Sequence, residues 1–169
     1  NKKIKDPANH KEVMKESKLF LDYDREWAFH VKTDGALVQL MYTHTDEGVE
    51  REGVLDTLKN TYLLSLDDAA GLTPFENMMG CDGFIFKYEL KEGECVFDFY
   101  RVMNDEVTKI ASCKGDMYHT DLDNDGQTEI LCSNGVSGHF NLFWADEKSQ
   151  AHECYLNEAT RKFLGLSSL

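Results

Sequence analysis

In the C-terminal half of the chain, apolar and polar side chains alternate with a period of two. Phe84, Phe86 and Tyr88 occupy every second position, and the alternation resumes at Cys95 after a polar turn at residues 91–94. Because the side chains of a strand point alternately to its two faces, this pattern is typical of a half-buried hairpin. Further strands are expected at residues 107–113, 128–132 and 139–145, and together they predict an antiparallel β meander.

The N-terminal half shows helical spacing instead. Apolar residues recur three and four positions apart over residues 54–70, which predicts an amphipathic helix that Gly71 would end. The pair Asp6-Pro7 is a typical helix start, because Asp accepts hydrogen bonds from first-turn amides and Pro lacks a donor that would stay unpaired. We therefore expect a second helix over residues 7–18.

Two further elements complete the expected secondary structure. Residues 27–32 and 36–44 are predicted as strands, and the turn sequence at residues 33–35 between them favours a hairpin. A short helix is expected at residues 157–164. The predicted fold class is therefore α+β, with N-terminal helices packed on an antiparallel β meander.

Charge separates the first 18 residues from the rest of the chain. Residues 1–18 hold six lysines and three acidic residues, whereas the 169 residues together hold 18 basic and 31 acidic side chains. We expect a basic helical or tether segment at residues 1–18 and a single α+β domain at residues 19–169. The chain begins at Asn1 and not at Met, from which we expect a processed or trimmed form.

The composition disfavours two classes of function. A net charge of -13 repels phosphate backbones and anionic lipid head groups, so no nucleic-acid partner is expected. No apolar run approaches the roughly 18 residues that a membrane-spanning helix needs, so no membrane insertion is expected either.

An acidic segment at residues 121–129 carries the clearest chemical signal. Carboxylates stand at its positions 1, 3, 5 and 9, and glycine stands at position 6. Calcium prefers six to eight oxygen ligands, and glycine permits the sharp bend that such a loop needs. The predicted ligands of a structural calcium ion are the side chains of Asp121, Asp123 and Asp125, the backbone oxygen of Gln127, and Glu129 directly or through water. The alternative is an acidic surface turn without an ion.

The residues around this segment distinguish between kinds of calcium loop. An EF-hand needs a bidentate Glu at position 12 between two helices, but Cys132 occupies that position and the flanking residues alternate as strands do. The sequence Glu-Ile-Leu-Cys after the loop, then a turn and His-Phe-Asn-Leu-Phe-Trp, resembles the FG-GAP and VCBS-type repeats over residues 107–146. The Phe-Gly and Gly-Ala-Pro elements that name the first of these families are not recognisable here.

The resemblance implies a structural role for the ion. In that family a calcium loop joins adjacent strands of a β-blade, which would make the C-terminal half blade-like, and most members are extracellular or cell-surface binding modules. The residues that match the family's ligand positions are Asp121, Asp123, Asp125 and Glu129, where Glu129 stands in place of the commoner Asp.

Other reactive side chains give weaker signals. The five cysteines (81, 95, 113, 132 and 154) have no Cys-x-x-Cys spacing, and Cys113 and Cys132 are either two small buried residues, which we favour, or a disulfide pair. The six histidines lack the spacing of a zinc site, and we expect His119 to be a polar loop residue. Phe140, Phe143 and Trp144 are expected mainly in the core, with a sugar-stacking platform as the alternative. The adjacent acids at 67–68 and 146–147 are expected to be ordinary surface turns and not a catalytic pair.

These observations favour a non-catalytic, calcium-stabilised binding or scaffolding module of an exported or cell-surface protein. Its partner would be a protein or a glycan that the sequence does not identify. The main alternative is a secreted carbohydrate-active enzyme or its inactive relative, which would need two acids about 5 to 10 Å apart in a concave pocket. A third hypothesis is an intracellular calcium switch, which would expose apolar surface when it binds the ion.

Overall fold

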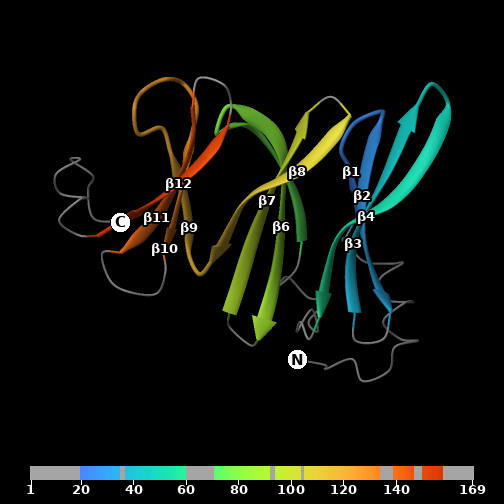
Figure 1. The fold of residues 1–169 in the computed structure, drawn as a ribbon, viewed down its shortest axis with the longest axis horizontal. Coiled ribbons are helices and arrows are strands. Elements are labelled where there is room, and N and C mark those ends of the chain that lie inside the picture. Colours follow the sequence, from blue (N-terminus) through green and yellow to red (C-terminus); the bar gives the residue numbers. More distant parts are fainter. Residues whose placement is uncertain are drawn as a thin grey trace. The chain divides into compact units, whose positions relative to one another are not determined.

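The fold is all-β in every part of the chain that the structure describes. The computed structural model describes residues 20–34, 37–59, 71–91, 94–103, 105–133, 139–146 and 150–157. These ranges contain twelve strands in three four-stranded antiparallel sheets and no helix (Figure 1). The predicted α+β class is therefore wrong for the described residues.

Each sheet is built from four strands that follow one another in the sequence. The first sheet has the order β1-β2-β3-β4, with β1 at Phe20–Asp22, β2 at Trp27–Asp34, β3 at Leu37–Asp46 and β4 at Val49–Lys59. The second has the order β5-β6-β7-β8, with β5 at Gly71–Met78, β6 at Cys81–Lys91, β7 at Glu94–Met103 and β8 at Glu106–Lys114. The third has the order β12-β11-β10-β9, with β9 at Met117–Thr120, β10 at Glu129–Ser133, β11 at Phe140–Ala145 and β12 at Ala151–Leu156.

The chain divides into two compact units. The first consists of Asn1–Pro74 and Ile85–Cys95, and the second consists of Phe75–Phe84 and Val96–Leu169. The first unit therefore holds the whole first sheet, and the second unit holds the whole third sheet and β8.

The predicted helix over residues 54–70 is wrong where the structure can test it. Residues 54–59 belong to β4, which pairs with β3 in antiparallel register. Val54 pairs with Met41 and Asp56 with Leu40, so Leu55 is an extra residue at a β-bulge. A bulge shifts the alternation of a strand by one residue, which gives apolar residues a three-residue spacing that imitates a helix.

The other predicted helices lie outside the described residues. This applies to residues 7–18, 60–70 and 158–164, and so also to the predicted basic tether. The predicted strands are confirmed, since each of them lies, to within one residue at its ends, in one observed strand: β2, β3, β6, β7, β8, β10 or β11. The predicted antiparallel meander of the C-terminal half is divided between two four-stranded antiparallel sheets, with β8 in one sheet and β9 in the other.

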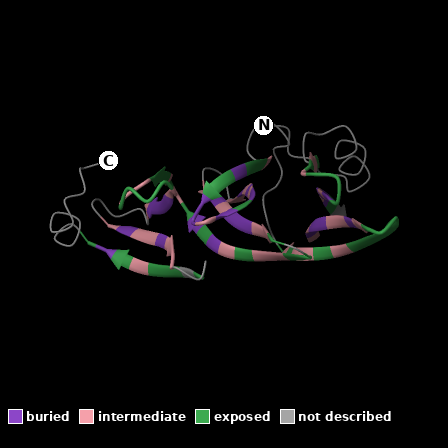
Figure 2. Cartoon of the chain, turned by 90° about the horizontal axis from the view of Figure 1, so that it is seen from above, coloured by how far each residue is buried: buried purple, intermediate pink, exposed green. Residues whose placement is uncertain are grey.

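The core of the first unit comes from the inward faces of β2 and β3. Trp27, Phe29 and Val31 alternate along β2 and are buried, and Leu40 on β3 is fully buried. The Trp27 ring stacks on the buried His44 ring, with 4.0 Å between the ring centroids. Buried and more exposed bands alternate along the strands in Figure 2, as the period-two pattern of the sequence requires.

The core of the second unit is rich in aromatic rings. The Phe84 and Tyr100 rings stack with 5.0 Å between their centroids, and the Phe75 ring is tilted on Phe99. Ile130 on β10 is also fully buried.

Candidate metal centre

The acidic segment is a tight connection between two paired strands. It runs from Asp121 to Thr128 and joins β9 to β10. Thr120, the last residue of β9, pairs with Glu129, the first residue of β10. The strand pair therefore holds both ends of the loop together, and the carboxylates between them have to share a small volume.

The structure brings the four acidic residues of the predicted site together. Asp121, Asp123, Asp125 and Glu129 each offer a carboxylate oxygen, and these oxygens lie within 4.8 Å of one another. Such a cluster of oxygens can hold a hard cation. Gln127, the fifth predicted ligand, lies in the same loop, where its backbone N–H donates to Asp125 Oδ1 at 2.8 Å.

Backbone hydrogen bonds to the aspartates curl the loop. The Gly126 N–H donates to Asp121 Oδ2 at 2.9 Å, and the Asp125 N–H lies 3.2 Å from Asp121 Oδ1. Asn124 and Gly126 adopt positive φ angles of 58° and 85°. Asn and Gly are the residues that reach this left-handed region most easily, so the sequence of the loop suits its bends.

Glu129 differs from the three aspartates because it is buried. Only 7% of the residue is exposed, and one carboxylate oxygen accepts a hydrogen bond from the Leu122 N–H at 2.7 Å. Burial raises the pKa of Glu129, and the nearby charges of Asp123, Asp125 and Asp121 raise it further, against the opposing effect of the Leu122 hydrogen bond. The pKa of Asp123 is also raised, by desolvation first and by its acidic neighbours.

The end of β5 and the turn between β5 and β6 contact the loop. The Met79 N–H donates to the Thr128 carbonyl at 2.7 Å, and the Thr128 N–H donates to the Asn77 carbonyl at 3.3 Å. The side-chain amide of Asn77 also donates to the Gly126 carbonyl at 3.4 Å. Sequence reasoning missed Asn77, because about fifty residues separate it from the loop and no motif links the two.

A disulfide joins β8 to β10, the strand that follows the loop. Cys113 on β8 and Cys132 on β10 are bonded, with a Cα–Cα distance of 5.5 Å. The favoured interpretation of these two cysteines, as small buried residues that are not paired, is therefore wrong. Cys81, Cys95 and Cys154 are free, and burial raises the pKa of the Cys81 thiol to about 11.

The aromatic residues near the loop lie mostly in the core, as expected. Phe140 and Phe143 are buried, so their rings are not a sugar-binding platform. Trp144 is half-buried and stacks on His152, with 4.5 Å between the ring centroids. His152 Nε2 lies 2.7 Å from Asp146 Oδ2.

The other candidate groups of the sequence are exposed or lie outside the described residues. His119 is exposed on β9, so it lies in a strand and not in the expected loop. The acids at residues 67–68 and at residue 147 lie outside the described residues. A hollow of about 470 Å³ beside β7 and β8 includes two adjacent exposed acids, Asp105 and Glu106. Nothing else about these two acids indicates catalysis.

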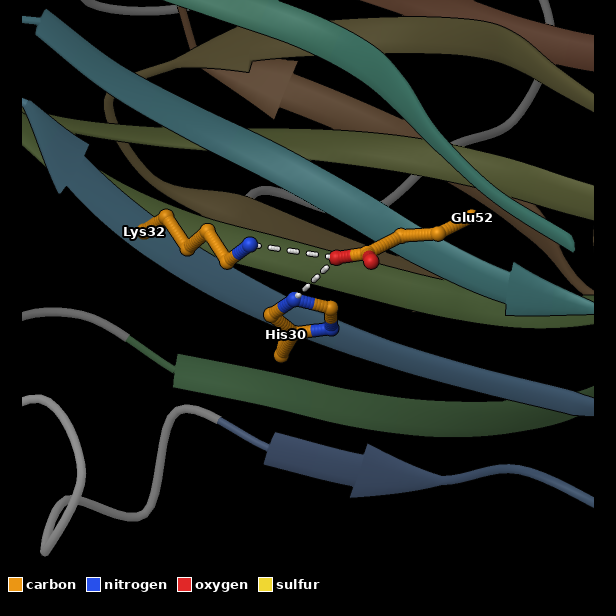
Figure 3. Close-up of polar contacts among 3 residues, drawn as sticks. All are labelled: His30, Lys32 and Glu52. Atoms are coloured by element: carbon orange, nitrogen blue, oxygen red, sulfur yellow. Dashed lines mark hydrogen bonds and ion pairs between the residues drawn. The ribbon is translucent and has the colours of Figure 1, made fainter.

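A polar cluster on the first unit was not predicted. Glu52 Oε1 lies 3.2 Å from Lys32 Nζ and 3.5 Å from His30 Nε2, so one carboxylate faces both groups (Figure 3). Partial burial lowers the pKa of His30, although Glu52 opposes this shift. The Lys32 hydrogen bond and charge lower the pKa of Glu52.

Comparisons with protein-family models, curated proteins and solved structures found no match to this chain. No helix in the described part of the chain is long and apolar enough to span a membrane.

Proposed function

We propose that this protein is a non-catalytic binding or scaffolding module whose second unit is stabilised by a calcium ion in the loop at residues 121–129. The proposed ligands are the carboxylates of Asp121, Asp123, Asp125 and Glu129, together with the backbone oxygen of Gln127. The ion would join β9 to β10 rigidly. The partner would be a protein or a glycan.

The observation that carries this proposal is the position of Glu129. Its carboxylate is buried beside three other carboxylates and has no cationic side chain as a partner in the described part of the chain. Burial of an ionised carboxylate is costly, and the single Leu122 hydrogen bond opposes this cost, as a proton or a cation at Glu129 also would. A divalent cation would neutralise Glu129 and remove the repulsion among all four acids.

Calcium fits this set of ligands better than a transition metal does. The cluster offers only carboxylate oxygens, which suit hard cations, and no described His or Cys side chain belongs to it. Loops of this kind in extracellular modules bind calcium at roughly 10⁻⁴ to 10⁻³ M, which exceeds cytosolic concentrations.

An exported or cell-surface location follows as part of the proposal. Disulfides persist in oxidising compartments and are rare in the cytosol. The Cys113–Cys132 disulfide therefore supports an exported protein over an intracellular calcium switch.

The direct test is thermal unfolding of the oxidised protein with and without calcium. We expect 10 mM calcium to raise the Tm by about 3 to 10 °C, because a ligand that binds only the folded state stabilises it by mass action. Asp123→Ala should abolish this rise, whereas Asp105→Ala, which removes an exposed acid outside the cluster, should preserve it. An equal rise in Asp123→Ala would place the ion elsewhere, and no rise in the wild type would refute the proposal.

A further inference from the structure

The Cys113–Cys132 disulfide closes a ring of chain that contains the whole candidate metal centre. Its two half-cystines are 19 positions apart in the sequence. Strand β9, the acidic loop and the first residues of β10 all lie between them. All four clustered carboxylates are therefore inside one covalently closed ring.

Burial and a backbone hydrogen bond fix the part of the ring next to the disulfide. Cys113 is fully buried and Cys132 is 4% exposed, so solvent hardly reaches either sulfur. The Ser133 N–H donates to the Asp116 carbonyl at 2.8 Å, which ties β10 to the residues that follow β8. Gly115 lies against this contact, since an added Cβ atom would be 2.6 Å from the Ser133 carbonyl oxygen.

We propose that the redox state of the Cys113–Cys132 disulfide sets the affinity of the acidic loop for its cation. This inference rests on the proposed function, because it concerns the same site. With the disulfide closed, the ends of the ring are fixed and the carboxylates are ordered in advance. With the disulfide open, the chain between residues 113 and 132 gains conformations, and cation binding has to order it again.

The coupling acts in both directions. If the disulfide strengthens cation binding, the cation must stabilise the disulfide form by the same factor. Because both sulfurs are buried, a reductant reaches them only when the contact between β8 and β10 opens. A bound cation keeps that contact closed, so it should also slow the reduction.

The chemical step is an ordinary thiol–disulfide exchange with a dithiol reductant. A thiolate of the reductant attacks one sulfur, the protein S–S bond breaks, and the second thiol of the reductant resolves the mixed disulfide. Two electrons and two protons pass to the protein, which gains two thiols. The dithiol becomes a cyclic disulfide.

The first test measures the calcium Kd of the oxidised full chain by isothermal titration. The variant Cys113→Ala/Cys132→Ala should bind calcium at least about five-fold more weakly than the wild type, which is the lower range of typical coupling. The control Cys154→Ala removes a free thiol from the third sheet and should leave the Kd unchanged. An equal Kd in the wild type and the double variant would overturn the inference and leave the proposed function standing.

The second test does not depend on the folding of a disulfide-free variant. The rate at which a dithiol reduces wild-type Cys113–Cys132 is followed by mass spectrometry after alkylation, over a range of calcium concentrations. We expect the rate to fall at least about five-fold at saturating calcium. In Asp123→Ala the rate should not respond to calcium. A wild-type rate that calcium does not change would overturn the inference, and an oxidised wild type that binds no calcium would overturn it together with the proposed function.

Discussion

Gly83 on β6 leaves no room for a side chain against the backbone carbonyl oxygen of Tyr100 on β7. An ideal Cβ atom built at Gly83 would overlap that oxygen and would lie 2.9 Å from the Phe75 ring. A backbone oxygen within a paired strand cannot move aside as a flexible side chain can. Gly83 is thus required by packing and not by a turn.

We expect Gly83→Ala to lower the free energy of unfolding by about 3 kcal/mol or more, since overpacking of a core typically costs about 1 to 3 kcal/mol and this clash involves backbone. The control is Gly71→Ala, because a Cβ atom at Gly71 meets no atom within 4 Å. It should change stability by less than about 0.5 kcal/mol. Urea unfolding of both variants measures the difference, and similar midpoints would contradict the close approach.

The buried Asp98 should contribute strongly to the stability of the second unit. Asp98 is fully buried on β7, Ser112 Oγ donates to its Oδ1 at 2.6 Å, and Lys109 Nζ lies 3.7 Å from its Oδ2. Asp98→Ala would remove one partner of each group and leave a small cavity. We expect the free energy of unfolding, measured in urea, to fall by about 2 to 4 kcal/mol. This is less than the full cost of breaking a buried ion pair, because Lys109 is partly exposed. Ser112→Ala, which removes one hydrogen bond, should cost only about 1 kcal/mol.

The stability of the calcium-free protein should depend on pH through Glu129. Its pKa in the folded state is raised above the ordinary value of 4.5, so the folded state binds the proton more tightly than the unfolded state does. In chelator, this contribution to stability is therefore present below pH 4.5 and is lost as the pH rises through the folded-state pKa. Glu129→Gln should flatten this part of the profile of Tm against pH.

Calcium should reverse this dependence of stability on pH. It binds the ionised carboxylate and so lowers the apparent pKa of Glu129. In saturating calcium, the Tm should rise with pH over the range in which it falls in chelator. A wild-type profile that is the same in calcium and in chelator would contradict the role given to Glu129.

The His30 cluster offers a test of electrostatics by two opposite substitutions. Glu52 raises the pKa of His30 and Lys32 lowers it, while burial gives the net downward shift. Glu52→Gln should therefore lower the His30 pKa further, and Lys32→Gln should raise it. NMR titration of the imidazole signals measures both. Glu50→Gln, at an exposed position two residues away, is the control, and shifts of the same sign in both variants would contradict the arrangement in Figure 3.

Sequence patterns predicted strands that alternate clearly in polarity or that flank a turn signal. The alternation at residues 84–90 and 95–99 indicated β6 and β7, and the turn signal at residues 33–35 indicated the pairing of β2 with β3. Strand β4 was mistaken for a helix because its bulge at Leu55 becomes visible only once β3 is paired with it. Strands β1, β5, β9 and β12 were not predicted. Of these, β1 and β9 have only three and four residues, which are too few to show a period.

For the candidate site, the sequence alone determined which acids converge. Asp121, Asp123, Asp125 and Glu129 fall within nine residues, so one tight bend of the chain is enough to bring their carboxylates together. Only the tertiary structure decided that Glu129 is buried, that Asn77 contacts the loop and that Cys113 is bonded to Cys132. These features depend on contacts between segments far apart in the sequence, and such contacts form only when the strands pack.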